Sequence, residues 1–66
     1  MNVTINGSAH EVPSGTTVAQ AVRALTEATT GVAVAVNDEV VTRSTWETTA
    51  LADSDRVEVL TAVQGG

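Results

Sequence analysis

The alternation of hydrophobic and polar residues predicts a β-hairpin at the start of the chain. Val3 and Ile5 alternate with polar neighbours in residues 2–6, which is the two-residue period of a half-buried strand. The pair Asn6-Gly7 follows, and it favours a tight hairpin turn because both residues tolerate positive φ. The stretch SAHEV then predicts the returning strand, which the sequence PSG closes.

A helix is predicted next, because the apolar spacing changes from the period of a strand to that of a helix. One apolar stripe over about two turns is formed by Val18, Ala21, Val22 and Leu25. Thr17 and Gln20 have the spacing of a capping box at the N-terminus of this helix. Gly31 marks the end of the helical region and the turn that follows it.

The rest of the chain predicts further strands around one irregular segment. Residues 32–36 (VAVAV) are typical of a central strand, with the valines on one face and the alanines on the other. A turn at residues 37–39 leads into a short edge strand, Val40-Val41. The threonine-rich residues 42–55 are irregular, and Trp46 and Leu51 are expected to anchor them to the core. The turn DSD then precedes the last strand, RVEVLTAV.

This order of elements predicts one α+β domain. One main helix packs on one face of a mixed sheet of four to five strands. A chain of 66 residues is near the lower limit for independent folding, so its core is small.

The charge and the length of the apolar runs exclude several classes of partner. The net charge is −5, with three arginines and no lysine, so the surface repels nucleic-acid backbones. The longest apolar run, residues 32–36, is far below the roughly 20 residues that cross a bilayer. The start of the chain lacks the pattern of a secretory signal. We therefore expect a cytoplasmic protein that binds neither nucleic acid nor membrane.

The side chains offer no set of residues for catalysis. The chain has no cysteine, which excludes disulfides, thiol nucleophiles and Cys-ligated zinc. The one histidine, His10, is followed by Glu11, but neighbours on a strand point to opposite faces and form no dyad. Asp53 and Asp55 are better explained as turn formers than as metal ligands. We expect a protein that is not an enzyme and that holds no metal or cofactor.

The C-terminus is the remaining candidate for chemistry. The chain ends in AVQGG, and Gly65 and Gly66 add no bulk, so such a tail fits a narrow channel in another protein. The tail delivers one functional group, the terminal carboxylate. This group is inert to nucleophiles until ATP converts it to an acyl-adenylate. The sequence therefore predicts a folded domain at residues 1–63 and a flexible reactive tail at residues 64–66, the substrate of an adenylating enzyme.

The whole chain resembles the small sulfur carrier proteins of thiamine biosynthesis, the ThiS family, which have a β-grasp (ubiquitin-like) fold. The resemblance rests on INGS in the first hairpin, VAVAVND and VVTRSTW in the middle, and LADSDRVEVLTAVQGG at the end. The spacing of Arg43 and Trp46 and the terminal Gly-Gly are its more specific marks. The chain departs from the family at two turn positions, Thr42 where proline is common and Ser54 where glycine is common.

The resemblance implies a reaction cycle at Gly66. An E1-like adenylating enzyme activates the carboxylate with MgATP, and a relay fed by a cysteine desulfurase converts it to a thiocarboxylate. Thiazole synthase then accepts the sulfur. Gly65, next to Gly66, is required because it has no side chain. The absence of cysteine agrees independently, because any carried sulfur must then lie at the terminus. The alternatives are a carrier for molybdopterin or cysteine formation, a protein modifier, or a plain binding module.

Residues near the tail are candidates for partner contacts. Val57 and Val59 are predicted to face the helix, which leaves Leu60 on the opposite face near Ala33 and Ala35 as a small apolar platform. The candidate contacts are Leu60, Ala62, Gln64 and Arg43. Arg43 has the alternative of pairing with a local carboxylate, and Trp46 is expected to cover the core. The isolated chain is expected to be a monomer.

Overall fold

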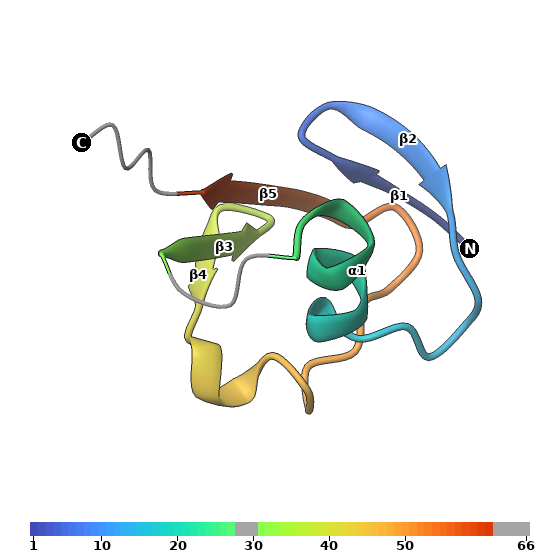
Figure 1. The fold of residues 1–66 in the computed structure, drawn as a ribbon. Helices are drawn as coiled ribbons and strands as arrows, with labels where there is room; N and C mark the ends of the chain where they lie inside the picture. The colour runs from blue at the N-terminus through green and yellow to red at the C-terminus, as the bar shows by residue number, and fades with distance from the viewer. Residues whose placement is uncertain (28–30, 62–66) are drawn as a thin grey trace.

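The structure, a computed structural model, describes residues 1–27 and 31–61 of the chain (Figure 1). Its elements follow the predicted order of strands and helix. They are β1 (Asn2–Ile5), β2 (Ser8–Glu11), α1 (Val18–Leu25), β3 (Val32–Val36), β4 (Glu39–Val41), the 3-10 helix η1 (Arg43–Thr45) and β5 (Arg56–Thr61).

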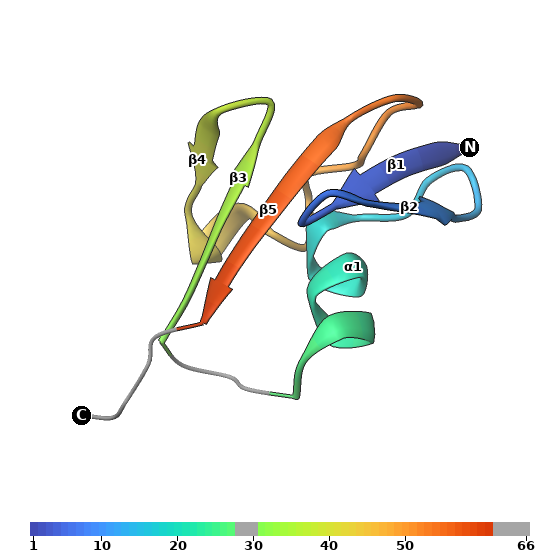
Figure 2. The same ribbon diagram turned by 90° about the horizontal axis from the view of Figure 1, so that it is seen from above.

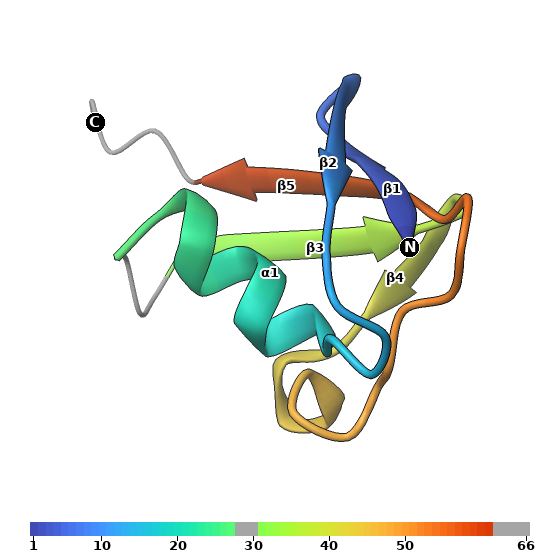
Figure 3. The ribbon, with the colours of Figure 1, turned by 90° about the vertical axis from the view of Figure 1, so that its right-hand side faces the viewer.

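The five strands of the described residues form one mixed sheet in the order β2-β1-β5-β3-β4 (Figure 2). The first and last strands, β1 and β5, run parallel in its centre, and the other neighbours are antiparallel. Helix α1 covers one face of this sheet, as Figure 3 shows. The predicted architecture of a mixed sheet with one helix on one face is confirmed.

Tight turns close both hairpins of the described residues. Asn6 and Gly7 have φ values of 51° and 84°, and Asn37 and Asp38 have values of 51° and 72°. Positive φ at both central residues matches the right-handed twist of the flanking strands, and Asn, Asp and Gly tolerate it best. The hairpin predicted at Asn6-Gly7 is therefore confirmed, as is the turn after β3.

Helix α1 begins at the predicted capping box. The backbone N–H of Gln20 donates to Thr17 Oγ1 at 3.3 Å, and the N–H of Thr17 donates to Gln20 Oε1 at 3.0 Å. One expectation about its apolar face was wrong, because Leu25 is 46% exposed while Ala19 is buried. The reason lies outside the helix. The loop that carries Trp46 covers Ala19, whose N–H donates to the Trp46 carbonyl at 3.1 Å, whereas Leu25 is the last helical residue.

The core lies between α1, the inner face of the sheet and the irregular segment after β4. Trp46 and Leu51 anchor that segment as predicted, with exposures of 7% and 5%. The indole Nε1–H of Trp46 donates to the Val41 carbonyl at 2.9 Å, which satisfies its polar group at the edge of the core. The buried apolar residues are Val3, Ile5, Val18, Ala19, Ala21, Val22, Val34, Trp46, Leu51, Val57 and Val59.

The acidic turn before β5 is structural, as the sequence indicated. Asp53 Oδ1 accepts from the N–H of Asn2 at 2.8 Å, and Asp55 Oδ2 accepts from the N–H of Ala52 at 2.7 Å. Between them, Ser54 has a φ of 72°, a backbone region that favours glycine. This conformation explains why glycine suits the position at which the chain has serine.

Candidate functional site

Strand β5 leads from the middle of the sheet toward the C-terminus. It pairs with β3 from Val36 opposite Val57 to Val32 opposite Thr61. Val57 and Val59 are 0% and 4% exposed, so this strand is fixed by the core. The predicted site residues Ala62, Gln64, Gly65 and Gly66 lie outside the described residues.

An apolar patch lies on the outer face of the sheet, opposite α1. The register places Leu60 beside Ala33 on the neighbouring strand, and it places Ala35 beside Val40. Paired residues of antiparallel strands project from the same face, so these four side chains share one surface, which we call the outer patch. Leu60 is 70% exposed and Val40 is 78% exposed. The predicted position of Leu60 is confirmed.

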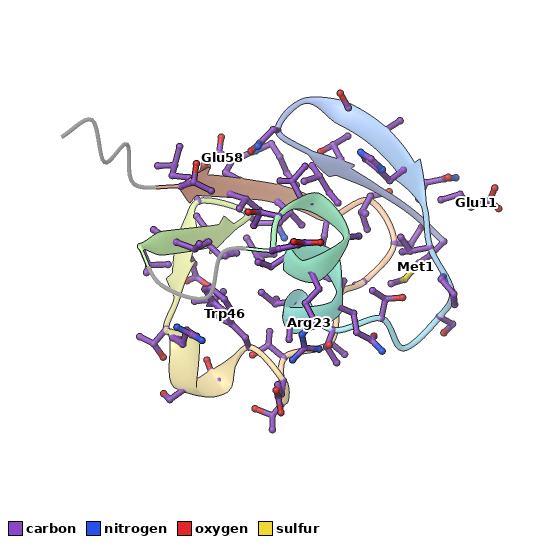
Figure 4. All side chains as sticks on the ribbon, in the orientation of Figure 1. Met1, Glu11, Arg23, Trp46 and Glu58 are labelled. Atoms are coloured by element: carbon purple, nitrogen blue, oxygen red, sulfur yellow. The ribbon has the colours of Figure 1, made fainter. Side chains whose placement is uncertain are left out.

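Sequence reasoning missed the contribution of Val40 to the outer patch. A signal was present, because a two-residue turn at Asn37-Asp38 places Val40 opposite Ala35. Charged residues border the patch along β5. Glu58 lies on the side of that strand away from α1 (Figure 4). Arg56 pairs with Asp38 at 2.6 Å, and this hydrogen bond raises the pKa of the Arg56 guanidinium above its ordinary value.

Arg43 stands on a different part of the surface. Its guanidinium carbon lies 5.5 Å from the centre of the Trp46 ring, within the range of a cation–π contact. Trp46 is held in the core, as Figure 4 shows, so it presents a fixed platform to Arg43. A groove of about 550 Å³ opens beside them, between α1 and η1.

Arg43 differs from the other two arginines in its partners. Arg23 pairs with Glu47 at 3.0 Å, and Arg56 pairs with Asp38. Within residues 1–27 and 31–61, no carboxylate lies within 4.0 Å of the Arg43 guanidinium. In this part of the chain the alternative of a local carboxylate is therefore wrong, and the aromatic ring holds Arg43 instead.

Other chemistry is not assembled in the described part of the chain. The register places His10 opposite Val3 and Glu11 opposite Asn2, so the two side chains face opposite sides of β2 and form no dyad. Residues 1–27 and 31–61 contain no cluster of three or more acidic or histidine side chains that could hold a metal ion. Over the same residues, no helix has the length and hydrophobicity to cross a membrane.

A mixed sheet that grips one helix, with its last strand in the centre, defines the β-grasp class of small proteins. A model of the ThiS family matches residues 3–66, so the chain belongs to the ThiS family. A search among curated proteins found no match.

Two solved structures share this fold. One is the crystal structure of the thiamine biosynthesis protein ThiS from Geobacter metallireducens, and the other is a solution structure of a thiamine biosynthesis protein from the same organism. Each is 35% identical to this chain, with a TM-score of 0.80 over 100% of its length. The match covers 100% of the crystallised chain and 88% of the other. Family membership supports a sulfur-carrier role in thiamine biosynthesis.

Proposed function

We propose that the chain carries sulfur as a thiocarboxylate on Gly66 for the formation of the thiazole moiety of thiamine. The observation that carries this proposal is the match to the ThiS family over residues 3–66, a span that includes the terminal Gly-Gly. The absence of cysteine adds to it, because the chain has no thiol on which to hold a persulfide.

The chemistry of the terminus takes two steps. The carboxylate attacks the α-phosphorus of MgATP in the partner enzyme, pyrophosphate leaves, and an acyl-adenylate forms. A sulfur donor at the oxidation level of sulfide then attacks the carbonyl carbon and displaces AMP, which leaves the thiocarboxylate. The chain supplies the carboxylate and binds no cofactor of its own, so it is a co-substrate of the adenylating enzyme and not a catalyst.

We assign residues 1–63 to the folded domain and residues 64–66 to the reactive tail. Gly65 and Gly66 have no side chains, which suits passage of the terminus through a narrow channel of the partner. The sulfur comes from a relay such as one fed by a cysteine desulfurase, in which a thiol reductant releases the persulfide sulfur at the oxidation level of sulfide and is itself oxidised to a disulfide. Thiazole synthase is the acceptor. We place this cycle in the cytoplasm and expect the free chain to be a monomer.

Two surfaces are proposed to contact the partners. The outer patch is the first, with Leu60 on its β5 side and Ala62 and Gln64 following along the chain. It adjoins the last described residues of β5, so an enzyme that receives the terminus meets it. Arg43 is the second contact, because an exposed cation held by an aromatic ring suits a carboxylate of the partner.

Intact mass spectrometry tests this function. The chain is incubated with the adenylating enzyme, ATP and a sulfur source, and fragmentation locates any change, because oxidation of Met1 gives nearly the same mass shift. We expect exchange of oxygen for sulfur on Gly66. The matched control is a chain that lacks Gly66, which we expect to fold normally and to remain unmodified. An unmodified full-length chain, with active partners, would overturn the proposal. The synthase that then accepts the sulfur separates thiazole formation from molybdopterin or cysteine formation.

A further inference from the structure

Two asparagines hold β5 through their side chains, one toward each end of the strand. Both occupy the first position of a tight turn, and both have a φ of 51°. Asn37 holds the start of β5, because its Oδ1 accepts from the N–H of Arg56 at 3.0 Å and its Nδ2 donates to Asp55 Oδ1 at 2.9 Å. Asn6 holds a position further along, at Val59.

The contacts of Asn6 replace a missing stretch of strand. The parallel pairing of β1 with β5 ends at Ile5 opposite Val57. The backbone N–H of Asn6 still donates to the Val57 carbonyl at 2.9 Å. Beyond that point its side chain takes over. Asn6 Oδ1 accepts from the N–H of Val59 at 2.8 Å, and Asn6 Nδ2 donates to the Val59 carbonyl at 3.1 Å.

A primary amide has the donor and the acceptor of a peptide group, so the Asn6 side chain can pair with Val59 as a strand would. The pairing of β5 on its β1 side is thereby extended by two residues, from Val57 to Val59. Leu60 and Thr61 follow, and among the described residues their strand partner is β3. Up to Thr61, the last residue described at this end of the chain, Asn6 is therefore the last contact of β5 on the β1 side.

We propose that Asn6 is a positioning residue for the reaction of the terminus. This inference rests on the proposed function. By fixing both polar groups of the Val59 backbone, Asn6 holds the last described residues of β5 in one arrangement. When the end of β5 is already held in this arrangement, a partner that receives the terminus can bind without first ordering the strand. Without these bonds only a fraction of the chains holds the productive arrangement, and the apparent affinity falls by that fraction.

The test separates the contacts of Asn6 from its role in the turn. Asn6→Gly keeps a residue that tolerates positive φ and removes both bonds to Val59. Asn37→Gly is the matched control, because it also keeps its turn and also loses two side-chain hydrogen bonds, here at the start of β5. Adenylation is measured as pyrophosphate release with the adenylating enzyme, together with the exchange rate of the Val59 amide hydrogen and the melting temperature.

For Asn6→Gly we expect a KM for the carrier about three- to tenfold higher, an unchanged kcat, and faster exchange at Val59. For Asn37→Gly we expect a similar fall in melting temperature and a KM within about twofold of the unchanged chain. An equal rise of KM in both variants would mean general destabilisation and would overturn the inference. So would an unchanged KM in Asn6→Gly.

A second variant covers the case in which Asn6→Gly does not fold. Asn6→Asp keeps the size, the turn preference and the acceptor for the Val59 N–H, and it loses the donor to the Val59 carbonyl. It also adds one negative charge, for which Ser14→Asp is the control. We expect it to raise KM as well, and an unchanged KM would again overturn the role of Asn6. The two proposals fail differently. If the unchanged chain is not adenylated, the proposed function falls and the inference with it; if it is adenylated, only the comparison of KM values decides the role of Asn6.

Discussion

The two faces of β5 have opposite characters although their residues alternate along one short strand. Val57 and Val59 point into the core and are 0% and 4% exposed, whereas Leu60 on the other face is 70% exposed. The inner face is explained by folding alone, since it buries apolar surface against α1. The outer face contributes little to folding, and we propose that it serves to bind a partner. In this proposal, one strand both stabilises the domain and carries the surface that contacts a partner.

The largest effect is expected when the inner face is changed. Val57→Ala removes two fully buried methyl groups and leaves a cavity, so the free energy of unfolding should fall by about 2 to 3 kcal/mol. Urea denaturation followed by circular dichroism measures this loss. In conditions where the variant is still folded, its KM in adenylation should match that of the unchanged chain. If Val57→Ala raised KM without a loss of stability, the inner face would act in binding, and the two faces would not have separate roles.

A change on the outer face should give the reverse result. Leu60→Thr keeps a residue suited to a strand and removes the apolar reach of the side chain, so stability should change by less than about 0.5 kcal/mol. If the outer patch docks on the adenylating enzyme, KM should rise about five- to tenfold, as expected for the loss of one buried leucine contact.

The control for Leu60→Thr is Leu25→Gln. Leu25 is also an exposed leucine, but it belongs to α1, on the other side of the sheet. Its replacement should leave KM unchanged. An equal rise of KM for the two substitutions would show that the partner does not bind the outer face in preference to the face covered by α1.

The start of β5 allows a smaller change that affects stability only. Ser54 has a φ of 72°, which costs an L-residue about 1 to 2 kcal/mol, so Ser54→Gly should stabilise the domain by about 0.5 to 1 kcal/mol after the entropy lost by glycine. Ser14→Gly is the control, because Ser14 is not among the described residues with positive φ, and it should destabilise by a similar amount. Both variants should have the KM of the unchanged chain in adenylation. A change of KM in Ser54→Gly would contradict the prediction that the start of β5 affects stability only.

The sequence predicted those features that depend on neighbouring residues. The turn at Asn6-Gly7, the capping box of Thr17 and Gln20, and the alternation of β3 all follow from local rules, and the structure confirms them. The sequence did not predict every feature that depends on distant contacts. Leu25 was assigned to the core because the helical period cannot reveal that the Trp46 loop covers Ala19 instead.

The candidate site was predictable only in part. Leu60 could be placed on the outer face because strand alternation is local. The bonds from Asn6 to Val59 could not, because they join residues far apart in the chain through a side chain that the sequence explains as a turn former. Gly65 and Gly66 stand out in the sequence by their lack of side chains, and they lie outside the described residues. Their role stays a prediction.

The smallest effect is expected for Arg43. Its replacement tests whether the partner contacts the groove beside η1 as well as the outer patch. If Arg43 meets a carboxylate of the adenylating enzyme, Arg43→Ala should raise KM about two- to fivefold at low salt, and this difference should shrink as salt screens the pair. Ser14→Asp lowers the net charge by the same amount at an exposed loop position and is the control for general repulsion. Equal effects of the two substitutions would mean that only net charge matters, and docking would then be confined to the outer face. A larger effect of Arg43→Ala would establish a second contact, on the side of the molecule where Trp46 holds the guanidinium.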